Sequence, residues 1–170
     1  MKRNHLFHLD IQGYYQFITF RTDDSLDRFL KSLATQNSPH QQKQRMVEDH
    51  LDSSQEGAYL NDEVLDSLNS LLKSKHGEWY DLIAFSIMPN HVHLLLKPHI
   101  KLAAVMQKIK GSSSRSINKI MGRSGRFWAP DYYDRTIRDQ KHFDLVYDYI
   151  KNNPLKLGKN ECYRFYGVYE

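Results

Sequence analysis

Residues 82–98 read LIAFSIMPNHVHLLLKP, and this stretch decides the fold. Two runs of apolar, aromatic and β-branched side chains, at 79–88 and 91–97, flank the turn-forming pair Pro89 and Asn90. A proline then ends the second run. The stretch therefore predicts two consecutive strands joined by a turn.

Outside these two strands, helical and strand patterns alternate along the chain. The predicted helices carry apolar residues at helical spacing, and the predicted strands are rich in aromatic and β-branched residues. Helices are predicted at 23–33, near 44–51, from Asn61 to about residue 76, at 101–121 and from Asp139 to about residue 153, and further strands at 14–22, 132–138 and 162–169. This βαββαβ order predicts an α+β fold, a ferredoxin-like antiparallel sheet with helices on one face. The helix that Asp139 caps is an addition to that arrangement.

Length and composition narrow the class of protein. The chain has 170 residues, 40% of them hydrophobic, which is enough for a core and suits one domain over residues 1–170. Its apolar runs are far shorter than the roughly 20 residues that span a bilayer, and no apolar signal region follows the start. The single cysteine, Cys162, cannot form an internal disulfide, which is typical of a reducing cytoplasm. A secreted mini-protein, a membrane protein and a coiled coil are excluded.

Residues 34–57 are interpreted as a polar insertion.

Charge is distributed unevenly along the chain. The net charge is +4, but residues 101–159 hold 13 Lys and Arg against 5 Asp and Glu, whereas the rest holds 11 against 15. A basic half beside an acidic half indicates a polyanionic partner that approaches from one side. An ordinary solvated face is the alternative. Within the basic helix, the Gly-Ser-Ser-Ser run at 111–114 lowers helix propensity and favours a kink.

Two histidines stand two residues apart in the second predicted strand. Side chains at positions i and i+2 of a strand point to the same face, so His91 and His93 are expected to converge. Two imidazoles can bind a divalent metal ion but need a third ligand from elsewhere. A pair of surface histidines is the alternative reading, but rings inside so apolar a strand need partners for their nitrogens.

The last predicted helix carries a second candidate pair. Tyr149 and Asn153 are four residues apart and share a helix face, so a hydroxyl and an amide oxygen can reach one centre. Tyr147 is a rival, but its i+4 neighbour is Lys151, which cannot bind a metal ion as an ammonium. Pro154 disfavours a helical conformation at Asn153, which is expected just outside the last turn. Packing of Tyr149 against the core is the alternative.

Five blocks together resemble the HUH single-tyrosine transposases, and among them the REP-associated tyrosine transposases (the IS200-like branch). The blocks are YQFITFR at 15–21, LIAFSIMPNHVHLLLKP at 82–98, KIKGSSSRSINK at 108–119, GRFWAPDYYDRTIR at 125–138 and DYIKNNPLKLG at 148–158. They occur in the family's order over most of the chain. Residues 34–57 depart from the family pattern, because a compact single-tyrosine transposase does not need so long a segment.

The resemblance implies a metal-dependent DNA strand transferase. It implies that His91, His93 and Asn153 bind Mg²⁺ or Mn²⁺ and that Tyr149 is the catalytic nucleophile, forming a 5′-phosphotyrosine with single-stranded, hairpin-forming DNA. A tyrosine with an ordinary pKa near 10 needs such help to attack at neutral pH. Both a monomer and a homodimer stay open, and a cytoplasmic, nucleoid-associated location is expected.

A DNA-binding surface is predicted from the basic stretch. Positive side chains are expected to follow the phosphates and aromatic rings to stack on unpaired bases. The candidates are Lys108, Lys110, Arg115, Lys119, Arg123, Arg126, Trp128, Tyr132 and Tyr133. Solvent-exposed charge and core packing are the respective alternatives. A domesticated hairpin-binding protein without significant cleavage, and another HUH nuclease such as a replication initiator or relaxase, remain as alternative functions.

Overall fold

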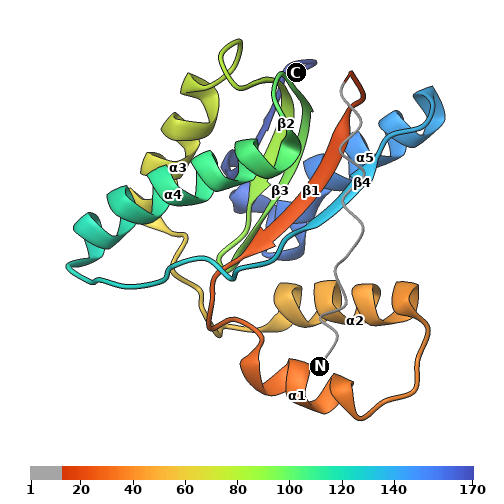
Figure 1. Cartoon of the computed structure of the whole chain (residues 1–170), viewed down its shortest axis with the longest axis vertical. Helices are drawn as coiled ribbons and strands as arrows, with labels where there is room; N and C mark the ends of the chain where they lie inside the picture. The colour runs from red at the N-terminus through yellow and green to blue at the C-terminus, as the bar shows by residue number, and fades with distance from the viewer. Residues whose placement is uncertain (1–12) are drawn as a thin grey trace.

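A five-stranded antiparallel sheet forms the centre of the molecule (Figure 1). The computed structural model describes residues 13–170, so the expected absence of a signal region at the N-terminus lies outside the described residues. The strands are β1 (Gln16–Arg21), β2 (Tyr80–Ile87), β3 (His91–Pro98), β4 (Tyr133–Thr136) and β5 (Phe165–Gly167). Their order in the sheet is β4-β1-β3-β2-β5. The first four have the ferredoxin-like order, and β5 adds the edge strand that the alternating tail predicted.

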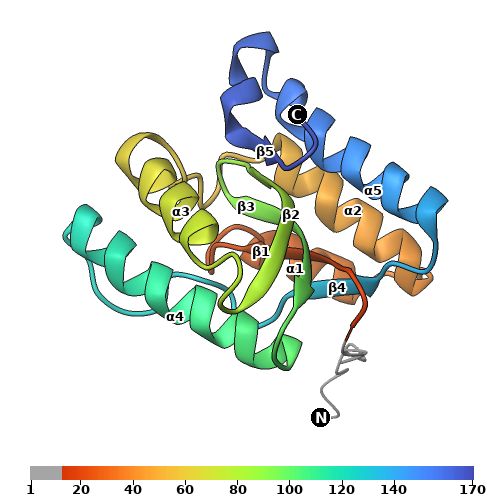
Figure 2. The same cartoon turned by 90° about the horizontal axis from the view of Figure 1, so that it is seen from above.

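Helices cover both faces of this sheet (Figure 2). On one side lie α3 (Asp62–Ser74) and α4 (Leu102–Met121), and on the other lies α5 (Gln140–Asn152). The predicted α+β fold is confirmed, with the tyrosine-bearing helix covering the face that a plain ferredoxin-like unit leaves open. No helix within residues 13–170 is long and apolar enough to cross a membrane.

Strand β3 divides its side chains between two cores. Successive residues of a strand face opposite sides, so Val92 and Leu94 pack into the core beneath α3 and α4. Leu95 packs into the core beneath α5. His91 and His93 have the same alternation as Leu95 and therefore face α5. The two-residue spacing thus places both imidazoles on the side of the tyrosine helix.

The predicted polar insertion contains a long helix. Between β1 and α3 the chain forms α1 (Asp27–Ala34) and α2 (His40–Ser53), which lie beyond the ends of the strands at the bottom of Figure 1. Helix α2 has 14 residues, longer than the segment near 44–51 that the weak periodicity predicted. Its Leu51 is buried. The segment is therefore an ordered element that packs on the domain.

The predicted helix caps and the predicted interruption of a helix are found only in part. Asp139 caps α5 as predicted, since its carboxylate accepts a hydrogen bond of 2.8 Å from the backbone N–H of His142. Asn61 precedes α3 but does not cap it, because its side chain instead binds Ala58 and Arg164. Helix α4 continues through residues 111–114 without interruption. Asn153 follows the last residue of α5 with helical dihedral angles and begins a short 3-10 turn.

Candidate catalytic centre

His91 and His93 lie side by side beneath α5 and are fully buried. Their ring centroids are 4.8 Å apart. Each ring is held through its Nδ1 atom: His91 contacts Asn90 Oδ1 at 2.7 Å, and His93 contacts Thr19 Oγ1 at 2.8 Å. Neither Nε2 atom has a hydrogen-bond partner among residues 13–170. Both rings therefore present one unused nitrogen to the same space.

The contacts of Asn90 fix the tautomer of His91. The Asn90 Nδ2 amide donates to the carbonyl oxygens of Ser54 and Glu56, at 3.2 and 3.3 Å, which leaves its Oδ1 as the atom facing His91. A carbonyl oxygen only accepts, so His91 carries its proton on Nδ1 and has a lone pair on Nε2. Burial lowers the pKa of both His91 and His93, and so favours the neutral imidazole that binds metal ions.

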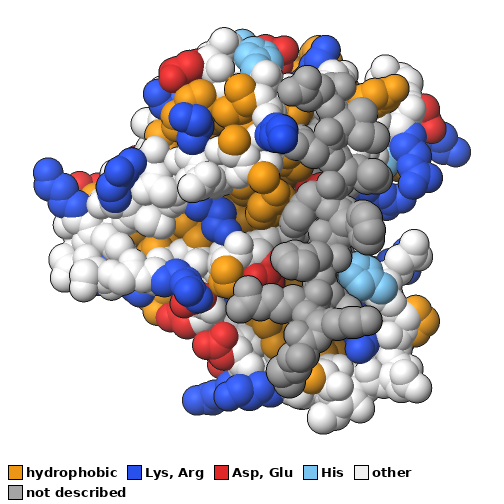
Figure 3. Space-filling view, viewed as in Figure 1, with side chains coloured by type: hydrophobic (Ala, Val, Ile, Leu, Met, Phe, Trp, Pro, Cys, Tyr) orange, Lys and Arg blue, Asp and Glu red, His pale blue; other side chains and the backbone are white. Residues whose placement is uncertain are grey.

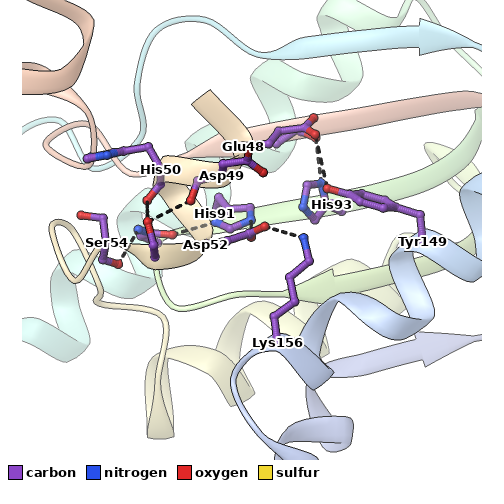
Figure 4. Close-up of polar contacts among 12 residues, drawn as sticks. Glu48, Asp49, His50, Asp52, Ser54, His91, His93, Tyr149 and Lys156 are labelled. Atoms are coloured by element: carbon purple, nitrogen blue, oxygen red, sulfur yellow. Dashed lines mark hydrogen bonds and ion pairs between the residues drawn. The ribbon is translucent and has the colours of Figure 1, made fainter. Parts of the chain in front are cut away.

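Tyr149 approaches the histidines from α5 (Figure 4). Its ring centroid is 5.2 Å from that of His93, and Phe17 packs against the Tyr149 ring at 5.9 Å. The Tyr149 hydroxyl donates to Glu48 Oε2 at 3.4 Å. Burial and the nearby carboxylates of Glu48 and Asp52 raise the pKa of Tyr149, so the phenol stays protonated unless its proton is removed.

Asn153 is the fourth predicted site residue. It is buried, and it lies close enough to the Tyr149 hydroxyl to favour the ionised phenol. Neither amide atom of Asn153 makes a hydrogen bond within 3.5 Å to any residue in the described part of the chain. The structure therefore brings Tyr149 and Asn153 together, as the helical spacing predicted.

Helix α2 brings two carboxylates that sequence reasoning missed. Glu48 and Asp52 are four residues apart and point from α2 towards the histidines and Tyr149 (Figure 4). Asp52 Oδ2 forms an ion pair of 2.5 Å with Lys156, and its Oδ1 lies 3.4 Å from His91 Nε2. Burial raises the pKa of Glu48. The i,i+4 spacing was visible in the sequence, but the direction of that helix face was not.

The atoms around this centre suit a metal ion in their chemistry. Nowhere in residues 13–170 do three or more His, Cys, Asp or Glu side chains gather closely enough to hold an ion as they stand. However, His91 Nε2, His93 Nε2, Asn153 Oδ1 and Asp52 Oδ1 are all buried and lack hydrogen-bond partners within that range. Buried polar atoms are nearly always satisfied, so these four unpartnered atoms are available as ligands. Imidazole nitrogens with amide or carboxylate oxygens are ligands that divalent ions accept.

Most of the predicted DNA-binding cations lie away from this centre. Lys108, Arg115 and Lys119 are exposed on α4, across the sheet from the histidines. Lys110 is engaged within the protein: its ammonium donates to the carbonyl oxygens of Ala129, Pro130 and Asp131, and burial lowers its pKa to about 8. We therefore leave Lys110 out of the DNA-binding set.

Arg123 and Arg126 follow α4 in a loop. The Arg123 guanidinium stacks over the rings of Tyr59 and Phe127, at 5.3 and 5.6 Å from their centroids. Arg126 is exposed and forms a loose ion pair of 3.8 Å with Asp23. Arg123 is partly exposed and Arg126 is exposed, so their role as phosphate contacts stays a prediction.

The three predicted base-stacking aromatic residues have different surroundings. Trp128 is 3% exposed, packs edge-on against Phe20 and donates from Nε1 to Ser113 at 2.8 Å. Its rings are enclosed by the core, so the prediction that Trp128 stacks on a base is corrected. Tyr132 packs partly buried against the core beneath α4. Tyr133 packs on Phe17 on the tyrosine side of the sheet.

Comparison with known proteins places the chain. It is 30% identical over 103 residues to an uncharacterized protein of Haemophilus influenzae, a match that covers 46% of this chain and 57% of the relative. The chain therefore spans little more than half of that relative. A solved REP-associated tyrosine transposase bound to a REP hairpin aligns with a TM-score of 0.53 and 16% identity, over 93% of this chain and 75% of the other. That likeness shows the fold.

A putative transposase from Deinococcus radiodurans R1 aligns with a TM-score of 0.47 and 20% identity, over 90% of this chain and 98% of the other. The family model described as "Transposase IS200 like" matches residues 53–153. This range includes both histidines, Tyr149 and Asn153, and begins one residue after Asp52. More than half of the sequence thus fits the model, and the chain belongs to the IS200-like transposase family.

Proposed function

We propose that this chain is a transposase that cleaves and rejoins single-stranded DNA, with Tyr149 as the nucleophile. The observation that carries the proposal is the packing of the Tyr149 ring against His93, which lies beside His91, with the Nε2 atoms of both buried imidazoles unused. A phenol beside a set of metal-ligating atoms is suited to attack on a phosphate.

The chemistry at Tyr149 is a transesterification. Its Oη forms a bond to the phosphorus while the bond from phosphorus to the 3′ oxygen breaks. The departing oxygen takes up a proton from water, which leaves a 5′-phosphotyrosine and a 3′-hydroxyl. Glu48 faces the Tyr149 hydroxyl and is placed to accept its proton. One phosphodiester replaces another, so the reverse step rejoins strands without ATP. Lys156, whose ammonium lies 5.3 Å from the centre of the Tyr149 ring, is placed to meet the negative phosphate.

His91, His93 and Asn153 are the proposed metal ligands, with Mg²⁺ or Mn²⁺ as the ion. When bound, such an ion polarises the scissile phosphate and offsets the charge that develops on its oxygens. Thr19 and Asn90 orient the two rings by contacting their Nδ1 atoms, as residues behind metal-binding histidines commonly do.

The proposed substrate is a hairpin-forming single strand. The solved relative was bound to a REP hairpin, and we extend that partner to this chain as a proposal. The exposed cations of α4 lie on the other face from Tyr149. We therefore assign them to the hairpin stem or flanking DNA and leave the scissile strand to the tyrosine side, where Tyr133 lies.

A 3′-labelled hairpin oligonucleotide tests this function. With Mn²⁺ or Mg²⁺ present, the wild-type chain is expected to become covalently attached to the labelled fragment, and EDTA is expected to prevent the attachment. Tyr149→Phe is expected to form no adduct, whereas the control Tyr147→Phe on the same helix forms it. An adduct that persists in Tyr149→Phe contradicts the assignment of the nucleophile. Tight hairpin binding without any adduct from the wild-type chain favours a hairpin-binding protein instead.

A further inference from the structure

We propose that Asp52, on helix α2, is a further ligand of the metal ion, so that a carboxylate from outside the matched transposase region completes the centre. This inference rests on the metal site of the proposed function. It concerns a residue that precedes the family match, which begins at residue 53.

The first support is the contact between Asp52 and His91. Asp52 Oδ1 lies 3.4 Å from His91 Nε2, the nitrogen that the hydrogen bond to Asn90 leaves with a lone pair. Two acceptor atoms facing each other in a buried place repel unless a cation lies between them. Neither atom has a hydrogen-bond partner within residues 13–170. A shared metal ion satisfies both atoms at once.

The second support is the charge of the ligand set. Two neutral imidazoles and an amide bring no negative charge to a divalent cation, and Mg²⁺ and Mn²⁺ favour oxygen ligands, above all carboxylates. Asp52 supplies one such carboxylate, with a side chain only 11% exposed. Two histidines with one carboxylate form a set found at many divalent metal sites, and it leaves positions open for a substrate oxygen.

The third support is the way Asp52 is held. Lys156 binds its Oδ2 at 2.5 Å, which leaves Oδ1 directed at His91. The end of α2 is tied to the strand turn, because Asn90 donates to the carbonyl oxygen of Ser54 while its own Oδ1 holds His91. One connected set of contacts therefore holds Asp52 beside His91. Within residues 13–170 the side chains of His91, His93 and Asp52 must still shift to come within ligand distance of one ion.

Mn²⁺ titration of the metal-free full-length chain, followed by electron paramagnetic resonance of the free ion, tests the proposal. Asp52→Asn keeps the shape but removes the charge, and Asp52→Ala removes the ligand. We expect each to weaken Mn²⁺ binding by at least about ten-fold, with the larger loss in Asp52→Ala. Asp49→Asn, at an exposed position of the same helix, is the matched control and is expected to bind as the wild type does. Circular dichroism melting curves of each variant show that α2 is still folded.

The outcomes separate this inference from the proposed function. If both Asp52 variants bind Mn²⁺ as tightly as the wild type while His93→Ala does not bind it, Asp52 is only the ion-pair partner of Lys156 and the inference is wrong. Tighter binding by Asp52→Asn overturns it too. If the folded wild-type chain binds no Mn²⁺, and forms its DNA adduct in EDTA, the metal site of the proposed function itself is wrong.

Discussion

Glu48 shows how one side chain couples the pH to both stability and chemistry at this site. Its carboxylate is partly buried against the Tyr149 hydroxyl, and burial raises its pKa. The folded state therefore binds this proton more tightly than the unfolded chain, whose glutamates titrate near about 4.3. Stability from this group is complete below that unfolded pKa and is lost as the pH rises through the raised folded pKa.

Glu48→Gln is accordingly expected to raise the melting temperature at pH 8, because a neutral amide avoids the cost of a buried charge. Below about pH 3, where the wild-type carboxyl is protonated in both states, the difference should disappear. Scanning calorimetry across this pH range measures the effect, with Asp49→Asn as the exposed control on α2. The same variant should form the DNA adduct more slowly, since an amide cannot accept the Tyr149 proton. A Gln variant that melts below the wild type at pH 8 contradicts this account.

Some residues of the site could be predicted from local sequence spacing, whereas others are brought to it only by tertiary packing. The two-residue spacing of His91 and His93 and the four-residue spacing of Tyr149 and Asn153 were readable because local geometry fixes them. Thr19 contacts His93 across 74 residues of sequence, and Asp52 approaches His91, on strand β3, from helix α2. Contacts of this kind depend on how distant elements pack, and no local pattern encodes them.

At the scale of the element, α4 continues through the Gly-Ser run that lowers its helix propensity. Ser113, within the Gly-Ser run, is buried and donates to the carbonyl oxygen of Ile109 at 2.6 Å. The same hydroxyl accepts from Trp128 Nε1. The serine therefore provides the hydrogen-bond partner that a buried indole requires, while the helix continues. Low helix propensity here reflects a packing requirement that only the tertiary structure reveals.

Ser113→Ala should lower the free energy of unfolding by about 1–3 kcal/mol, because it leaves the buried Trp128 N–H without a partner. Urea denaturation followed by tryptophan fluorescence measures this loss, with Ser112→Ala on the same helix as the control. Hairpin affinity under native conditions should be unchanged, as expected if Trp128 is a core residue. Unchanged stability together with weaker DNA binding would return Trp128 to the DNA surface.

Helix α2 is the element whose length and buried face the sequence predicted least well. Its weak apolar periodicity indicated a short helix, yet it extends over His40–Ser53 and brings Glu48 to Tyr149 and Asp52 to His91. Burial of Leu51 fixes which face turns inward. Only Met46, Val47 and Leu51 are apolar among its 14 residues, which is too faint a signal to predict that face.

At the scale of the whole molecule, the sheet separates the predicted phosphate contacts from the chemistry. The basic stretch was expected to mark the side on which the scissile strand lies, but α4 and Tyr149 are on opposite faces (Figure 2). On the α4 face, Lys and Arg side chains are scattered among acidic and apolar ones (Figure 3). A charge count along the chain cannot distinguish the two faces, because the same stretch contains both α4 and α5. We therefore expect DNA binding and cleavage to be separable by mutation, if residues 1–170 form the single domain that the sequence predicts.

The double variant Arg115→Gln and Lys119→Gln tests this separation. Each cation removed from a phosphate should reduce the slope of log K against log salt concentration by about 0.7–0.9, so the double variant should reduce it by about 1.4–1.8. Hairpin affinity at low salt should therefore fall and its salt dependence should weaken. At saturating DNA the rate of adduct formation should be that of the wild type, because both side chains are exposed on the face opposite Tyr149. Fluorescence anisotropy at several salt concentrations and a single-turnover adduct assay measure the two quantities, with Lys31→Gln on α1 as the control. A slower adduct rate at saturation would mean that α4 positions the scissile strand, and an unchanged salt slope would mean that α4 does not bind the DNA.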